Sequence, residues 1–209
     1  NNYLNTEARN KQGIEPIKKY LDQINAIAKL EDITKLISTQ PMGNIYGIIP
    51  FGVSADLMDS NKYSFYMVPT TLLIGNADYY NKPDANAKKM QEMATKYLKN
   101  ILGLVGHTEE EAAQMVADAY KFEMLLTPSM IGQEEQTKMS NYYESLYNPY
   151  TVDELEKIAP NLHIKQMMKD MGFEEVKQVI VQEPKWLNAL NSIYTEENVG
   201  IMKSYLEIK

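Results

Sequence analysis

Two histidines are the side chains of this sequence best suited to bind a metal or to transfer protons near neutral pH. His107 precedes a threonine and three glutamates, and His163 follows Pro160-Asn161-Leu162. Neither belongs to the His-Glu-x-x-His pattern that places two imidazoles on one helix face around zinc. The chain has no cysteine, which excludes disulfides, thiolate nucleophiles and thiolate zinc sites. We therefore interpret both histidines as solvated loop residues and predict no metal site in this chain.

Other groups that could do chemistry have structural interpretations. The acidic run Glu109-Glu110-Glu111 is typical of a first helical turn, where the helix dipole stabilises carboxylates. The stretch from Gly103 to Gly106 lacks the preceding strand and the Lys-Ser/Thr ending of a phosphate-binding loop. Ser54 and Ser60 have no nucleophile-elbow context. The sequence thus predicts no catalytic, cofactor-binding or metal-ligating residue in these 209 positions.

Several tyrosines gather at expected turns. They are Tyr79, Tyr80, Tyr142, Tyr143, Tyr147 and Tyr150. Tyrosine combines a large apolar ring with a polar hydroxyl, so it suits both a core and a binding surface. The sequence leaves both uses open for this group.

Charge and composition exclude some classes of partner. The net charge is −7, from 28 acidic and 21 basic side chains, and Arg9 is the single arginine. This balance disfavours nucleic acid and anionic lipid. No apolar run approaches the roughly 20 residues of a membrane helix, so we expect no transmembrane segment in this chain. Because the sequence opens at Asn1 without methionine, we expect a trimmed product, which leaves a removed secretory signal open.

Two capping boxes mark helix starts. Thr151 with Glu154, and Thr108 with Glu111, have the spacing at which hydroxyl and carboxylate each bond the other residue's amide. Asn148-Pro149 predicts a turn before Thr151. Apolar residues at steps of three and four predict further helices, which we place at 14–30, 31–39, 84–104, 108–126, 165–171, from 184, and from 195 to 206.

Period-two patterns predict a small sheet. Residues 44–57 and 62–68 read as an antiparallel hairpin, and 176–182 as a third strand. Gly47, Pro50 and Gly52 indicate a bulge or an edge position in the first strand. The apolar connection from Pro69 to Pro83 is expected to pack against the core. The predicted fold is mainly α (α+β), a helical lobe with a small antiparallel β-sheet, spanning 1–209 without an internal boundary.

Five segments share a further property: their residue patterns occur together in one protein family. They are Gly13-Ile14-Glu15-Pro16-Ile17; Phe51 to Asp56 with Asn61-Lys62-Tyr63; Leu73 to Tyr80; Tyr147 to Leu155; and Val179-Ile180-Val181 with Pro184-Lys185-Trp186-Leu187. In this order they resemble the N-terminal region of neprilysin-type zinc endopeptidases, the family of the bacterial oligopeptidase O enzymes. The proline and arginine of the family's tyrosine segment are absent here, as is the arginine upstream of its Tyr-Asn signature.

The resemblance implies a function for a longer parent protein. In this family the zinc motifs lie in a C-terminal catalytic domain, and neither motif occurs in this chain. The chain would then be the N-terminal helical cap region, 1–209, of a zinc metallo-endopeptidase acting on small peptides. It would form and restrict the peptide cavity, would be inactive alone, and would present exposed aromatics and methionines to peptides. Its expected partners are peptide substrates and the missing catalytic domain.

Two points stay open from the sequence. The alternative function is a stand-alone, non-enzymatic helical module that binds peptides or proteins. The resemblance implies an extracytoplasmic location, whether periplasmic, secreted or surface-anchored, and a cysteine-free chain is equally compatible with the cytoplasm.

Overall fold

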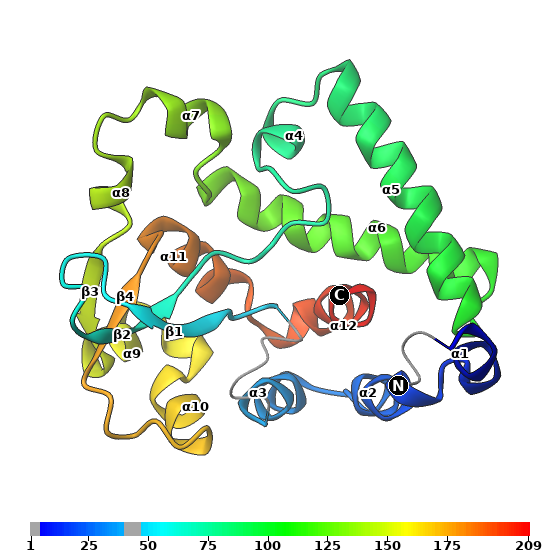
Figure 1. Cartoon of the computed structure of the whole chain (residues 1–209), viewed down its shortest axis with the longest axis horizontal. Helices are drawn as coiled ribbons and strands as arrows, with labels where there is room; N and C mark the ends of the chain where they lie inside the picture. The colour runs from blue at the N-terminus through cyan, green and yellow to red at the C-terminus, as the bar shows by residue number, and fades with distance from the viewer. Residues whose placement is uncertain (1–4, 40–46) are drawn as a thin grey trace.

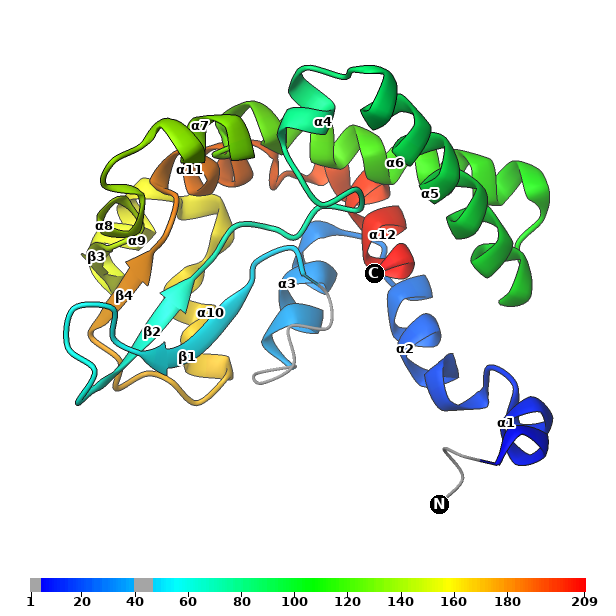
Figure 2. The same cartoon turned by 45° about the horizontal axis from the view of Figure 1, so that its top comes forward.

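A small sheet lies at one end of the molecule and a group of longer helices at the other (Figures 1 and 2). The computed structural model describes residues 5–39 and 47–209. The α-helices in this part of the chain are α1 Thr6–Gln12, α2 Glu15–Asn25, α3 Leu30–Ser38, α4 Asp78–Asn81, α5 Ala85–Leu104, α6 Glu109–Leu126, α7 Gln133–Lys138, α8 Tyr142–Ser145, α9 Val152–Ile158, α10 Ile164–Asp170, α11 Pro184–Ile193 and α12 Val199–Ile208. Short 3-10 helices are η2 Thr127–Ser129, η3 Pro160–Leu162 and η4 Glu196–Asn198.

The sheet has four strands in the order β1-β2-β4-β3. The strands are β1 Phe51–Ala55, β2 Tyr63–Met67, β3 Asn148–Thr151 and β4 Gln178–Val181. The predicted hairpin is confirmed, since β1 and β2 pair antiparallel with Val53 opposite Phe65. The first strand is at an edge, as its glycines and proline suggested, and residues 44–46 of its predicted range lie outside the described residues.

Two features of the sheet differ from the prediction. The third predicted strand forms as β4, but it pairs parallel to β2, so the sheet is mixed rather than purely antiparallel. The prediction of a turn at Asn148-Pro149 is wrong, because these residues belong to β3, which pairs antiparallel with β4. Proline is tolerated there because β3 is the second edge strand, where a missing amide need not break a ladder. The mainly helical fold with one small sheet is otherwise confirmed.

Local capping explains where several helices begin. The Thr151 hydroxyl accepts from the Glu154 amide at 3.2 Å, and the Thr151 amide donates to the Glu154 carboxylate at 2.8 Å. Thr108 and Glu111 repeat this arrangement at the start of α6. Thr195 makes no such bond; η4 follows it, and the last helix begins only at Val199.

The described residues form two apolar core clusters. The larger one joins the sheet to helices from both halves of the chain and contains the fully buried Trp186, Phe122, Tyr194 and Tyr205. A smaller cluster lies between α5 and α6, with α6 running back beside α5 (Figure 1). The connection from 69 to 83 packs down as predicted: its Leu72, Ile74 and Ala77 are buried, among other apolar residues of the core.

Candidate functional site

A buried carboxylate, Glu123, lies at the junction of α6 and the segment that leads into α4. Its side chain has no exposed surface. Oε1 accepts a hydrogen bond from the Leu73 amide at 2.7 Å, and Oε2 accepts a hydrogen bond from the Tyr80 hydroxyl. Tyr80 belongs to one of the five segments described above, so one motif tyrosine fixes this connection onto α6.

Burial dominates the electrostatics of this group. It raises the pKa of Glu123 to about 7, against the lowering effect of the hydrogen bonds from Tyr80 and Leu73. Burial and the adjacent carboxylate raise the pKa of Tyr80 as well. A carboxyl group with a pKa near 7 has the right proton affinity for acid-base catalysis. However, its oxygens are engaged inside the protein without exposed surface, so the geometry favours a structural role.

A second buried carboxylate, Asp56, organises the β1–β2 hairpin. Oδ2 accepts from the Ser64 hydroxyl at 2.5 Å and from the Tyr147 hydroxyl at 3.1 Å. Oδ1 accepts from the amides of Met58 and Asp59 at 2.9 and 3.1 Å. These contacts shape the hairpin loop and fasten it to the segment that precedes β3. The Tyr147 hydroxyl therefore donates to the buried carboxylate of Asp56, as the Tyr80 hydroxyl donates to that of Glu123.

The environment of Asp56 favours its charged form. The Ser64 hydrogen bond, followed by the Met58 and Tyr147 contacts, lowers the pKa of this carboxyl group against the effect of burial. Lys62 adds a weaker attraction, with its Nζ 3.9 Å from Oδ2. The pKa of Tyr147 is raised by burial and by its bond to the carboxylate. Asp56 is thus an ionised, fully hydrogen-bonded anchor rather than a proton carrier.

His107 lies in a loop, as predicted, but it is only partly solvated. Its Nε2 lies 2.6 Å from Oε1 of Glu207, and the two side chains are 24% and 4% exposed. This contact joins the α5–α6 loop to the last helix, α12, a pairing between residues 100 positions apart. His163 is exposed, as predicted, and adopts a left-handed conformation with φ of 49° between η3 and α10.

The remaining predicted residues take part in local structure. Glu111 caps α6, and Glu109 forms an ion pair with Lys99 at 3.1 Å. Ser54 lies in β1 and Ser60 in the hairpin loop, both exposed. The tyrosines differ in burial: Tyr80 is hydrogen-bonded to a buried carboxylate, whereas Tyr143 is 75% exposed.

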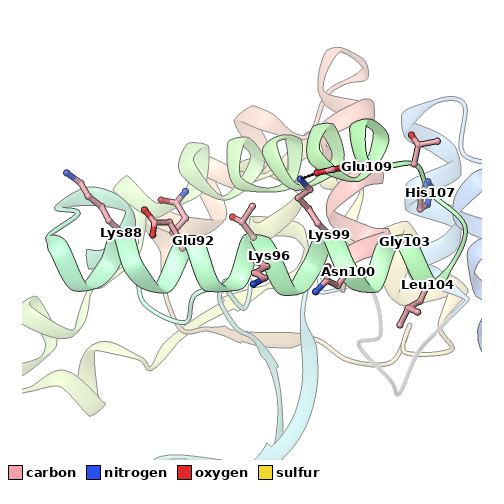
Figure 3. A pocket seen from close by; sticks show the side chains of 12 residues that line it. Lys88, Glu92, Lys96, Lys99, Asn100, Gly103, Leu104, His107 and Glu109 are labelled. Carbon is pink, nitrogen blue, oxygen red and sulfur yellow. Dashed lines mark hydrogen bonds and ion pairs between the residues drawn. The ribbon is translucent and has the colours of Figure 1, made fainter.

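An open groove of about 1080 Å³ follows one side of α5 (Figure 3). Most of its lining residues have polar or charged side chains, and His107 and Glu109 lie at one end. Helix α5 contributes three lysines and one glutamate to the lining: Lys88, Lys96, Lys99 and Glu92. Mixed charges on one exposed helix face describe a solvated surface, and this groove brings together no nucleophile with a base.

The donor atoms of this chain do not fit a zinc site. The two histidines line separate cavities, one beside α5 and the other between α3 and α10. Over residues 5–39 and 47–209, no group of three or more His, Cys, Asp or Glu side chains is close enough together to hold a metal ion. Within the same residues, no helix has the length and apolar character needed to cross a membrane.

Sequence reasoning missed both buried carboxylates and the His107–Glu207 contact. One signal pointed to Glu123: it continues the buried face of α6 formed by Ala112, Val116 and Ala119, at steps of three and four. Asp56 carried a weaker signal as the aspartate before the hairpin loop, a usual position for side chains that accept from nearby amides. No signal in the sequence pointed to Glu207.

Comparison with known proteins gives a consistent set of relatives. The chain is 28% identical over 205 residues to the neutral endopeptidase of Lactococcus lactis subsp. cremoris, covering 97% of this chain and 32% of that protein. It is 25% identical over 174 residues to neprilysin-3 of Drosophila melanogaster, covering 78% of this chain and 22% of that protein. The chain thus spans about a third or less of the length of these curated relatives.

Solved structures share the fold. The zinc metalloprotease Zmp1 of Mycobacterium tuberculosis, in complex with an inhibitor, superposes with a TM-score of 0.82 at 19% identity, over 98% of this chain and 31% of that one. PepO from Lactobacillus rhamnosis HN001 superposes with a TM-score of 0.74, over 95% of this chain and 31% of that one. The sequence model of the N-terminal region of peptidase family M13 matches residues 1–209 in full, and the chain therefore belongs to peptidase family M13.

Proposed function

We propose that this chain is the N-terminal, non-catalytic portion of a zinc-dependent metallo-endopeptidase that acts on small peptides. The observation that carries the proposal is the family match over all 209 residues, in a chain about a third as long as the neutral endopeptidases it resembles. The metal ligands and the residue that activates water would then come from polypeptide outside 1–209. An extracytoplasmic location is part of the same proposal.

Within that enzyme, the chain would form part of the wall of the peptide cavity and restrict which substrates enter. Exclusion by shape needs a rigid wall, and the Glu123 and Asp56 networks join segments far apart in the sequence into one body. Contact with varied peptides needs adaptable apolar side chains. Exposed tyrosines and methionines supply them, among them Tyr63, Tyr143, Met58 and Met124.

The size restriction can be tested on the full-length protein. A short fluorogenic peptide is offered free, and the same sequence is offered inside a loop of a stably folded protein. We expect cleavage of the free peptide, abolished by a chelator, and no cleavage of the folded substrate. Equal cleavage of both substrates would refute the restriction. A full-length protein that binds the peptide without cleaving it would favour the non-enzymatic binding module.

A further inference from the structure

Helix α5 has two apolar faces, and only one of them packs against other described residues of the chain. Ala94, Leu98 and Leu102 contact the cluster between α5 and α6. The other face, which we call the α5 stripe, consists of Met93, Tyr97, Ile101 and Leu104, with exposed fractions of 58%, 63%, 41% and 74%.

The four side chains of the α5 stripe form a continuous surface. Their spacing of four, four and three residues places them on one side of an α-helix. The groove described above follows the polar side of the same helix, with Glu92, Lys96 and Lys99, and Leu104 at the end of the α5 stripe borders it (Figure 3). A row of large apolar side chains that are exposed to water is typical of a surface that packs against another segment or protein.

The chain ends close to this surface. Glu207 contacts His107, which is three residues beyond Leu104, the last residue of the α5 stripe. Ile208, the next residue after Glu207, packs against the apolar cluster between α5 and α6. Any polypeptide that continues beyond Lys209 therefore starts near the C-terminal end of α5, the helix whose second apolar face is exposed in the described part of the chain.

We infer that, in the full-length protein, the polypeptide following Lys209 packs an apolar helix face against the α5 stripe. This inference rests on the proposed function, in which the chain is the first part of a longer enzyme. A helix is the matching element because side chains at steps of three and four form ridges and grooves that a second helix can fill. Relatives with about two thirds of their length outside the matched region have ample chain to supply it.

A second copy of the chain is a poorer occupant. Stable interfaces between separate proteins use about 20 to 30 residues a side, whereas the α5 stripe has four. A segment of the same polypeptide avoids most of the association cost, because its attachment near the stripe makes its effective concentration high. The small size and the position of the α5 stripe both favour an intramolecular partner.

Methionine oxidation of the unmodified full-length protein tests this inference without any mutation. Met93 in the α5 stripe, Met58 in the hairpin loop and Met124 in α6 are equally exposed in this chain, at 58%, 57% and 57%. Sulfoxide formation with limiting peroxide, followed by peptide mass spectrometry, reports which of them is covered. We expect Met93 to react roughly tenfold more slowly than the faster of the other two, as for a buried group reached only by local opening.

Introduced cysteines give an independent readout: residues 1–209 have none of their own, and peptide mass spectrometry separates their labels from those on any cysteine elsewhere in the protein. In the full-length protein, Tyr97→Cys and Leu104→Cys should react slowly with a maleimide, and the matched control Glu92→Cys, on the polar side of α5, should react fast. Oxidation of Met93 at the rate of the fastest methionine, or equal labelling of all three cysteines, would overturn the inference. Protection that disappears on dilution to a monomer would assign the stripe to a second copy and would overturn it too.

These outcomes are separable from failure of the proposed function. A full-length protein with Met93 protected but without chelator-sensitive peptidase activity would refute the proposed function and support the packing. An active peptidase with Met93 unprotected would refute the packing alone.

Discussion

The Tyr80 hydroxyl donates a hydrogen bond to Oε2 of Glu123, a carboxyl group with no exposed surface. The two residues are 43 positions apart, and their contact fixes the connection after the hairpin onto the last turn of α6. Burial raises the pKa of Glu123 to about 7, so the charge of the carboxyl group in this contact changes with pH in the neutral range.

The first prediction concerns stability against pH. The pKa of Glu123 in the folded protein, about 7, exceeds its ordinary value of 4.5, so folding favours the protonated form. The stabilisation is complete below the ordinary value and is lost as the pH rises through about 7. Between pH 5.5 and 8.5, the protein should lose on the order of 2 kcal/mol of unfolding free energy that Glu123→Gln does not lose. Urea unfolding at both pH values measures the difference; identical pH profiles would contradict it.

Removing the Tyr80 hydroxyl should act through the same carboxylate. Tyr80→Phe takes a hydrogen bond from a buried charged group, which costs roughly 1.5 to 3 kcal/mol at pH 8.5. The cost should shrink at pH 5.5, where Glu123 is protonated. Tyr120→Phe is the matched control, because the Tyr120 hydroxyl makes only long contacts of 3.4 and 3.5 Å to Gln91 and Thr95. A pH-independent loss in Tyr80→Phe would count against the assignment.

The hairpin anchor gives a third prediction. Asp56→Asn replaces a carboxylate that accepts from Ser64, Tyr147 and two amides, so it should lower the unfolding free energy. Because the pKa of Asp56 is lowered in the folded protein, its contribution is present above its ordinary value of 3.8 and is lost in stronger acid. Asp59→Asn, in the same loop, should have a much smaller effect. Chemical denaturation at pH 7 compares the two, and equal losses would refute the anchoring role.

Helix capping offers a fourth comparison. Thr151→Ala removes the side-chain bond to the Glu154 amide and should cost about 1 kcal/mol. Thr195→Ala should cost less, since the Thr195 side chain makes no capping hydrogen bond. Thermal unfolding of the two variants measures this order; a larger loss in Thr195→Ala would show that the caps are wrongly assigned.

Local signals allowed much of the fold to be predicted. Helix starts at Thr108 and Thr151 were predictable because a capping box depends on residues three positions apart. The hairpin was predictable for the same reason, since its two strands are joined by a short loop. The parallel pairing of β2 with β4 was not, because more than 100 residues separate the strands and a period-two pattern does not specify a partner.

The candidate site was harder to predict than the fold. Tyr80 with Glu123, Tyr147 with Asp56, and His107 with Glu207 are contacts between residues 43, 91 and 100 positions apart. Side-chain type suggests that a histidine or tyrosine will be hydrogen-bonded, but only the packed structure selects its partner. His107 was assigned to solvent because its neighbours in sequence are polar; Glu207 of α12, 100 residues later, contacts it and leaves it only 24% exposed.

The most direct test of the proposed function is peptide cleavage by the full-length protein and by residues 1–209, assayed side by side with and without a chelator. We predict chelator-sensitive cleavage of a short fluorogenic peptide by the full-length protein, and none by residues 1–209. Chelator-sensitive cleavage by residues 1–209 alone would contradict the proposal, because the described residues offer no donor set for the metal.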